Sequence, residues 1–237
     1  MEFQSFAISD QGKLREHNED AYLTLNKQQL WVIADGAGGH EKGEVASQLI
    51  VKQLAAFQKK ETLSDSVNWI IKQLRAVNTT LITMREQLAK GGIIGSTVCV
   101  LLFFEGHFVC IWSGDSRIYL YRDNQLFLLT QDHNRMEEFF KAGFDKTELV
   151  NYPMATQLTK AIGATDRLGI DVQLYEHSTE DIFLLCSDGL TGELTAEEME
   201  CIIRPKDSVH SVAKNLIGSV LKGTAKDNVT VVVVKGV

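Results

Sequence analysis

The sequence lacks the linkers that would divide the chain into domains, and it lacks the basic stripe of a nucleic-acid-binding protein. Its 237 residues include only two prolines, with no Pro-, Gly- or Ser-rich linker and no internal repeat. This favours a single domain over residues 1–237. Lys and Arg number 24 against 31 Asp and Glu, which gives a formal net charge of −7. Because binding along nucleic acid needs a basic stripe, and none is visible, we expect no nucleic-acid partner.

Long hydrophobic runs are also missing. The longest uncharged stretch, Gly91–Phe104, is shorter than the roughly 20 residues that a membrane-spanning helix needs. The first residues show no basic flank followed by an apolar segment, which a signal peptide would have. We therefore expect a soluble, cytoplasmic protein with no membrane partner. We also expect it to be a monomer.

The four cysteines form no Cys-x-x-Cys pair. Cys99, Cys110 and Cys186 lie in apolar runs that are typical of strands, and Cys201 stands apart from them. Buried, unreactive thiols are the simplest interpretation, and a zinc site or a disulfide framework is disfavoured. With 44% hydrophobic residues, the chain has enough apolar material for a large core.

One stretch combines an apolar run with an acid and a glycine-rich segment. Leu30–Ala34 is short and apolar, and it suits a strand that is buried on both faces. The run ends at Asp35, and the glycines that favour a tight turn follow: Gly36, Gly38 and Gly39. A carboxylate at the rim of a core is costly without a partner, so we expect a cation beside it.

Hydrophobic periodicity divides the chain into strands and helices. Strands are predicted at 3–8, 21–25, 30–34, 96–104, 107–113, 118–122, 126–130, 172–177, 181–187 and 229–234, with 118–122 and 126–130 forming a hairpin. Helices are predicted at about 43–57, 63–90, 135–143, 196–204 and 208–221, the fourth opened by a capping box of Thr195 and Glu198. The strands and helices come in clusters, which favours an α+β fold of antiparallel sheets covered by helices over a doubly wound sheet.

Several aspartates flank the predicted strands. Asp20 and Asp227 stand just before a strand, whereas Asp35, Asp115 and Asp188 follow one. An isolated aspartate in such a place is usually a turn former. If the sheets bring three or more together, their like charges need divalent cations, and carboxylate oxygens select hard ions such as Mg²⁺ or Mn²⁺. Spacing along the chain does not decide between these interpretations.

Short motifs follow one another along almost the whole chain. They are R-x-x-N-E-D at Arg15–Asp20, D-G-x-G-G-H at Asp35–His40, G-D-S-R at Gly114–Arg117, T-x-D-H at Thr130–His133, L-T-K-A-I-G at Leu158–Gly163, S-D-G-L at Ser187–Leu190 and D-N-x-T at Asp227–Thr230. Each motif alone is weak. The ordered set resembles the metal-dependent Ser/Thr protein phosphatases of the PP2C family, bacterial type.

The resemblance implies a four-layer αββα sandwich, in which helix pairs flank two antiparallel β-sheets and two Mn²⁺ or Mg²⁺ ions lie at one end. By analogy with the family, Asp35 would bridge the two ions and the Gly36 carbonyl would bind one of them. Asp188 and Asp227 would complete the other ion's ligands.

The same resemblance implies roles for further residues. Glu19 and Asp20 would hold metal-bound waters. Arg15 would be catalytic as a forked donor to two phosphate oxygens, which Lys cannot copy. His40 matches the family's general acid to the leaving alkoxide, and an imidazole titrating near neutral pH suits that task. The plain alternatives are a surface Arg in a charged loop and a His at the entry of a helix.

The implied activity is hydrolysis of phosphoserine and phosphothreonine on proteins by direct attack of a metal-bridging hydroxide, opposing a Ser/Thr kinase. Two divalent ions on one water lower its pKa and clamp the phosphoryl oxygens, so Asp35 would count as catalytic. Two alternatives stay open. One is a pseudophosphatase that binds phosphoproteins without hydrolysing them, and the other is a metal hydrolase of small phosphoesters.

Two positions depart from the family's pattern. Ala37 replaces a Met whose side chain is not a ligand, so we expect metal binding to be retained. Asp115 would hold a third metal together with Asp188 and an Asp four positions later, where this chain has Gly192. Unless Glu193 reaches in, we expect this third site to be weak or absent.

Residues of about 134–157 correspond to the family's flap, an insert beside the active site that is thought to influence substrate choice. The alternative is a plain surface helix and loop. The physiological substrate cannot be read from the sequence.

Overall fold

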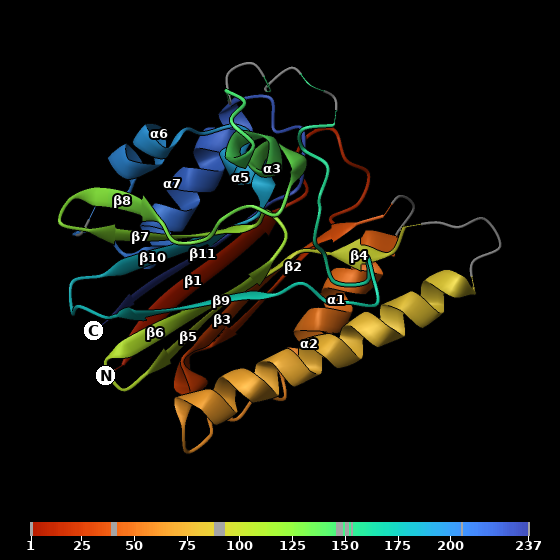
Figure 1. Cartoon of the computed structure of the whole chain (residues 1–237). Helices are drawn as coiled ribbons and strands as arrows, with labels where there is room; N and C mark the ends of the chain where they lie inside the picture. The colour runs from red at the N-terminus through yellow and green to blue at the C-terminus, as the bar shows by residue number, and fades with distance from the viewer. Residues whose placement is uncertain are drawn as a thin grey trace.

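Two antiparallel β-sheets lie face to face with helices outside them (Figure 1). The computed structural model describes residues 2–38, 42–87, 93–145, 149, 152, 154–204 and 206–236. In spatial order, one sheet contains β1 (Phe3–Asp10), β11 (Val229–Gly236), β10 (Ile182–Cys186), β7 (Arg117–Arg122) and β8 (Gln125–Leu128). The other contains β2 (Asp20–Leu25), β3 (Leu30–Ala37), β5 (Val98–Phe104), β6 (His107–Ser113) and β9 (Asp171–Glu176), with the short β4 (Gly95–Ser96) paired to β3.

Helices form the two outer layers. The pair α1 (Lys42–Leu54) and α2 (Leu63–Glu86) lies on the β3 sheet, and the pair α6 (Ala196–Ile202) and α7 (Val209–Lys222) lies on the β11 sheet (Figure 1). The remaining described helices are short: η1 (Asn26–Gln28), α3 (Arg135–Lys141) and α5 (Asp188–Thr191). This arrangement confirms the predicted α+β fold class with its αββα layers.

Strand β11 shows why the central strands are apolar on both faces. Val231 and Val233 pack into the core between the sheet and the α6–α7 pair, whereas Val232 and Val234 pack into the core between the two sheets. Successive side chains of a strand point to opposite faces, so a strand covered on both sides is apolar at most positions. A third core lies between the other sheet and helices α1 and α2.

Helix α2 forms as its apolar spacing predicts. Ile70, Leu74 and Leu81 are fully buried on one face, and the Thr62 side chain caps the start by accepting a hydrogen bond from the backbone of the third helical residue. The helix ends at Glu86, before the predicted end, and residues 88–90 of the prediction lie outside the described residues.

Several local predictions are confirmed. Strands β7 and β8 form a hairpin whose turn residues, Asp123 and Asn124, have φ angles of 53° and 61°, as a primed turn requires. Thr195 and Glu198 form the predicted capping box of α6. All four cysteines are free thiols, and only Cys201 is exposed.

The prediction that the strand ends at Asp35 is wrong. Strand β3 continues to Ala37, because Gly36 pairs with Ser96 and Ala37 with Gly95 of β4. The glycine after Asp35 therefore lies in a ladder and not in a tight turn.

The antiparallel topology brings the ends of different strands to one end of the sandwich. Asp20 at the start of β2 pairs directly with Asp35 near the end of β3. Asp188 follows β10, and Asp227 precedes β11, which is the neighbour of β10. A strand that begins at this end therefore lies beside one that finishes there, and acids far apart in sequence become neighbours.

Two expectations about organisation remain predictions. The flap predicted at 134–157 begins with α3, but residues 146–148, 150, 151 and 153 lie outside the described residues. The assignment of residues 1–237 to a single domain is also not tested. Within the described ranges, no helix is both long and apolar enough to cross a membrane.

We predict that Asn78→Ala destabilises the fold. The buried Asn78 side chain accepts a hydrogen bond from Gly163 N (2.7 Å) and donates one to Thr165 O (3.0 Å), which fixes a loop on α2. Leaving such buried backbone groups unpaired costs about 1–3 kcal/mol in the free energy of unfolding, measurable by urea denaturation. The control Asn68→Ala on the exposed face of α2 should change it by less than about 0.5 kcal/mol. Equal effects of the two substitutions would contradict this.

Candidate active site

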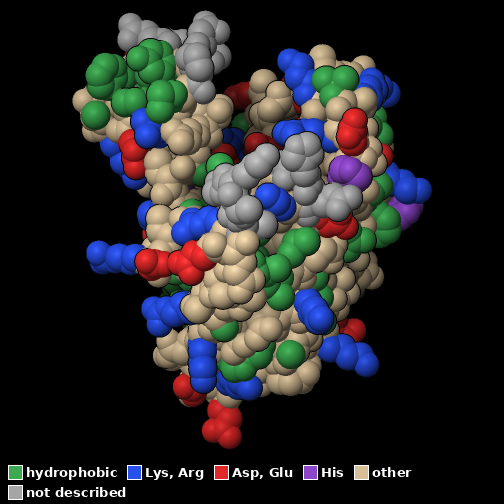
Figure 2. Space-filling model, turned by 90° about the vertical axis from the view of Figure 1, so that its right-hand side faces the viewer, with side chains coloured by type: hydrophobic (Ala, Val, Ile, Leu, Met, Phe, Trp, Pro, Cys, Tyr) green, Lys and Arg blue, Asp and Glu red, His purple; other side chains and the backbone are tan. Residues whose placement is uncertain are grey.

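A cavity of about 320 Å³ opens at the end of the sandwich where the aspartates gather. Figure 2 looks onto this side and shows a hollow between two raised lobes, with acidic side chains inside it. The described residues that line the cavity are Arg15, Glu19, Asp35, Gly36, Ala37, Gly38, Thr97, Asp115, Thr156, Leu158, Asp188, Asp227 and Asn228. Among these described residues, one Glu and four Asp face a single cation, Arg15. The cavity is therefore strongly acidic.

Asp35 is presented by a backbone that is held on both sides. Its N–H donates to Thr97 Oγ1 (3.1 Å), and its carbonyl accepts from Thr97 N (2.8 Å) and Ser96 Oγ (2.9 Å). Thr97 Oγ1 also shares a hydrogen bond with Ser116 Oγ (2.6 Å), next to Asp115. The strand that carries Asp35 and the loop that carries Asp115 are thus fixed to each other.

Asp188 and Asp227 are brought together by a glycine. A Cβ atom on Gly189 would lie 1.9 Å from the carbonyl oxygen of Asn228, closer than any side chain tolerates. Only glycine therefore lets the start of α5 approach the residues before β11. This contact explains the glycine of S-D-G-L in physical terms.

Gly36 has a similar role on the other sheet. A Cβ atom there would lie 2.2 Å from the carbonyl oxygen of Gly43, so glycine allows the first turn of α1 to lie against β3. Glu19 joins the same contact, because its carbonyl accepts from Gly36 N (3.1 Å) and its Oε1 accepts from Gly43 N (3.2 Å).

Asp20 lies below the cavity and is not among its described lining residues. Its side chain is buried, and its Oδ2 accepts hydrogen bonds from Ser187 Oγ (2.8 Å) and Thr230 Oγ1 (2.7 Å). Its Oδ1 is buried with no hydrogen-bond partner among the described residues. Burial raises the pKa of Asp20 to about 7, although the two hydroxyl donors oppose the rise.

Asn228 organises the loop that carries Arg15. This buried side chain donates to Gln11 O (2.8 Å) and His17 O (2.9 Å), and its Oδ1 accepts from Glu19 N (2.8 Å). One amide therefore fixes the start and the end of the loop over residues 11–19. Asparagine suits this position because its side chain both donates and accepts.

Arg15 extends from this loop to the rim of the cavity. Its Nη2 lies 2.6 Å from Asp227 Oδ2, and about half of its side chain (52%) is exposed. The expected cation is therefore present in the cavity, but its ion pair is with Asp227 and not with Asp35.

Burial and like charge act together on the acids. Burial, followed by the charges of the four neighbouring aspartates, raises the pKa of Asp35 well above its usual range. Burial also raises the pKa of Asp115 to about 7, and burial followed by the charge of Asp227 raises the pKa of Asp188. Asp35 and Asp188 line the same cavity. Charged carboxylates at this end cost free energy, which a bound cation would offset.

The donor set fits hard divalent cations. Asp35, Asp188 and Asp227 offer carboxylate oxygens, and the backbone of Gly36 lines the same cavity. The unpartnered Oδ1 of Asp20 is a further buried acceptor below them. Within the described residues, no group of three His, Cys, Asp or Glu side chains is arranged so that all of them could hold one metal ion. Because Mg²⁺ usually takes one or two carboxylates and keeps several waters, this set suits an ion whose shell water completes.

Two residues with an expected role in the site are not among the described residues that line the cavity. His40 lies outside the described residues, so its role stays a prediction. Glu193 does not reach towards Asp115, because its carboxylate accepts hydrogen bonds from Thr224 N (3.1 Å) and Thr224 Oγ1. Of the predicted third site, Asp115 and Asp188 line the cavity, and Gly192 offers no side chain.

Sequence reasoning missed the residues that hold the acids in place. Asn228 and Thr230 stood in a recognised motif, but no role followed from it. Ser96 and Thr97 had only one signal, a polar pair at the start of an apolar run. Their contacts join segments that are distant in sequence, so no local pattern could have identified the partners.

The sequence of the chain is similar to that of known protein phosphatases. A family model described as protein phosphatase 2C matches residues 13–216. Serine/threonine phosphatase stp of Listeria welshimeri is 32% identical over 235 residues, which cover 96% of this chain and 93% of that protein.

The solved structures agree. The serine/threonine phosphatase PstP/Ppp of Mycobacterium tuberculosis superposes with a TM-score of 0.91 at 30% identity, covering 100% of this chain and 99% of that one. The catalytic domain of the phosphatase PstP in complex with two manganese ions gives a TM-score of 0.85 at 31% identity, covering 99% and 98%. By sequence and by fold, this chain belongs to the protein phosphatase 2C family.

Proposed function

We propose that the chain is a metal-dependent phosphatase that hydrolyses phosphoserine and phosphothreonine on proteins. The observation that carries the proposal is the meeting of Asp35, Asp188 and Asp227 in one cavity with Arg15 at its rim. The relatives compared above are serine/threonine phosphatases, which supports this substrate class over small phosphoesters. The three acids are all present in the cavity, which favours hydrolysis over binding alone.

Asp35, Asp188, Asp227 and the Gly36 carbonyl would hold two Mn²⁺ or Mg²⁺ ions, and Glu19 and Asp20 would act through water. When bound, such a pair of cations supplies Lewis acidity to the phosphoryl oxygens and activates the attacking water. The protein's own contribution is position. The Thr97 and Asn228 hydrogen bonds fix the strand of Asp35 and the loop of Glu19 before substrate arrives.

Arg15 would bind the phosphate. With Nη2 on Asp227, its Nη1 and Nε make no hydrogen bond to a described residue and can donate to two phosphate oxygens. The ion pair with Asp227 also orients the guanidinium towards the acids. The substrate phosphate would therefore lie between Arg15 and the cations, with its charge neutralised from both sides.

Further features of this function rest on the sequence and the family alone. We propose that a Ser/Thr kinase supplies the phosphoprotein, that the chain acts as a cytoplasmic monomer, and that His40 protonates the leaving alkoxide. The flap over 134–157 remains a proposed contributor to substrate choice.

We predict that Asp35→Asn abolishes Mn²⁺-dependent release of phosphate from a phosphothreonine peptide. Loss of a residue that only supports a metal ligand costs about 10–100-fold, so removing a ligand should cost at least about 100-fold. Asp123→Asn makes the same chemical change in the β7–β8 turn, where φ is 53° and Asn is tolerated, and should keep full activity. Turnover that survives both EDTA and Asp35→Asn would rule out the proposed chemistry.

We predict that calorimetric titration with Mn²⁺ resolves two sites and a third that is at least about tenfold weaker, because the chain has Asp115 and Asp188 but Gly192 in place of the third acid. Gly192→Asp should strengthen the third site, since Gly192 has an ordinary φ of −74° at the end of α5. Three comparable sites in the unmodified chain, or no gain in Gly192→Asp, would show that Gly192 does not limit this site.

A further inference from the structure

The T-x-D-H segment at residues 130–134 has no role in the chemistry above, although it lies beside the site. It connects β8 to α3 and includes the buried polar residues Thr130, His133 and Asn134. Buried polar side chains are costly unless they are hydrogen-bonded. Their partners therefore show what the segment does.

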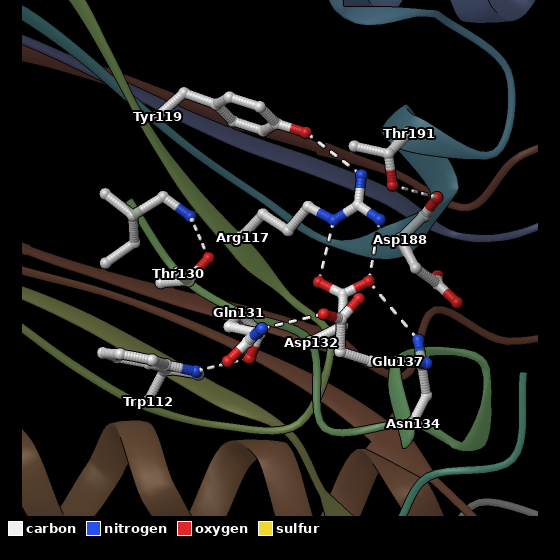
Figure 3. Close-up of polar contacts among 11 residues, drawn as sticks. Trp112, Arg117, Tyr119, Thr130, Gln131, Asp132, Asn134, Glu137, Asp188 and Thr191 are labelled. Carbon is white, nitrogen blue, oxygen red and sulfur yellow. Dashed lines mark hydrogen bonds and ion pairs between the residues drawn. The ribbon is translucent and has the colours of Figure 1, made fainter. Parts of the chain in front are cut away.

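The first partner is the chain just after Asp115. Asp132 accepts two hydrogen bonds from Arg117, from Nε (2.9 Å) and from Nη2 (2.7 Å), and Arg117 Nη1 donates to Tyr119 Oη (3.1 Å) (Figure 3). Thr130 Oγ1 accepts from Ile118 N (3.2 Å). A bidentate pair fixes both the distance and the orientation of the two groups.

The second partner is the residue just before Asp115. His133 N donates to Gly114 O (3.0 Å), and Gly114 N donates to His133 Nδ1 (3.2 Å). Because Nδ1 is an acceptor, the neutral ring carries its proton on Nε2, which lies 3.1 Å from Asp171 Oδ2 and 3.2 Å from Lys160 Nζ. Burial lowers the pKa of His133, which is consistent with this neutral tautomer. The segment therefore holds the Asp115 loop from both sides.

The third partner is the flap, both at its start in α3 and at the segment that follows it, residues 156–159, which we call the return segment. Asn134 caps α3 by accepting from Glu137 N (3.0 Å), and its Nδ2 donates to Asp132 Oδ2 (3.3 Å). Asn134 also forms a β-bridge with Leu158, and Thr159 N donates to His133 O (2.8 Å).

The return segment is part of the cavity wall. Thr156 and Leu158 line the cavity that holds Asp115 and Asp188. In Figure 3, Asp188 lies beside the Arg117 guanidinium, and Asn134 lies beside Asp132, to which it is hydrogen-bonded. The same few hydrogen bonds thus connect an acid of the site to the wall that the flap contributes.

We propose that residues 130–134 form a clamp that holds the Asp115 loop and the flap's root and return segment as one rigid unit. Arg117 and Asp132 are its central pair and act as positioning residues for the phosphatase site. The consequence for catalysis rests on the proposed function, whereas the mechanical coupling does not. Loosening the central pair frees both the acid loop and the flap root.

The chain contains a matched control for this pair. Arg122, at the other end of β7, makes the same bidentate contact with Asp181 (2.7 and 2.7 Å). Arg122→Lys therefore removes the same kind of forked contact from the same strand without touching the clamp. Arg117→Lys keeps the charge but loses the fork, and Asp132→Asn is the milder second variant.

Amide hydrogen exchange followed by mass spectrometry, without added metal, tests the coupling. In Arg117→Lys and Asp132→Asn, exchange should accelerate by about tenfold in peptides over both 113–118 and 133–143, as local opening becomes easier. In Arg122→Lys both peptides should exchange as in the unmodified chain. Acceleration in only one of the two segments, or the same pattern in Arg122→Lys, would overturn the clamp.

Kinetics tests the consequence for the site. Both clamp variants should raise the KM for a phosphothreonine peptide, because the peptide contacts the cavity wall. This fold-increase should be about ten times the fold-increase in the KM for p-nitrophenyl phosphate. Arg122→Lys should leave both constants unchanged. An equal effect on the two substrates would refute the positioning role. If the unmodified chain releases no phosphate from either substrate, the proposed function fails, and the exchange experiment still decides the clamp.

Discussion

The repulsion between buried like charges is the constraint on which the rest of this structure depends. Four aspartates line one cavity: Asp35, Asp115, Asp188 and Asp227. In water such carboxylates would move apart, and in a core they would be protonated. They stay together because backbone ladders and buried amides and hydroxyls hold the segments that carry them. The acids can therefore attract cations because hydrogen bonds in the surrounding fold hold the segments that carry them in fixed positions.

Two kinds of contact provide that rigidity. Glycines let backbones approach where no side chain would fit, as Gly189 does against Asn228. Small polar side chains then tie neighbouring segments together, as Thr97 does between the strand of Asp35 and the loop of Ser116. Both kinds of contact determine where the acids are when a substrate arrives.

Much of the fold was predictable because its elements follow local rules. The run over 229–234, the hairpin turn at Asp123 and Asn124, and the box of Thr195 and Glu198 each carry their signal within a few residues. The end of β3 was misplaced, since its last residues pair with β4, nearly 60 positions away in the chain. Glycine after an acid predicts a turn locally, but the ladder with Ser96 overrides it.

The site was predictable only through the order of its motifs. Asp20, Asp35, Asp115, Asp188 and Asp227 look like turn formers one at a time, and their convergence follows from the strand order and not from their spacing. The partners of Asp20 show the limit clearly. Ser187 and Thr230 reach it from the opposite sheet, and no pattern along the chain connects the three.

The pairing of β1 with β11 has a consequence for how the molecule folds. Phe3 lies opposite Gly236, so this ladder closes a loop of almost the whole chain (Figure 1). Contacts of such long range form slowly, because the entropy of loop closure is lost before the contacts repay it. At the other end of this ladder Asp10 lies opposite Val229, so the same pairing brings Asp227 beside the loop over residues 11–19. We therefore expect the repulsion among the acids to arise late in folding, once this long-range pairing has formed.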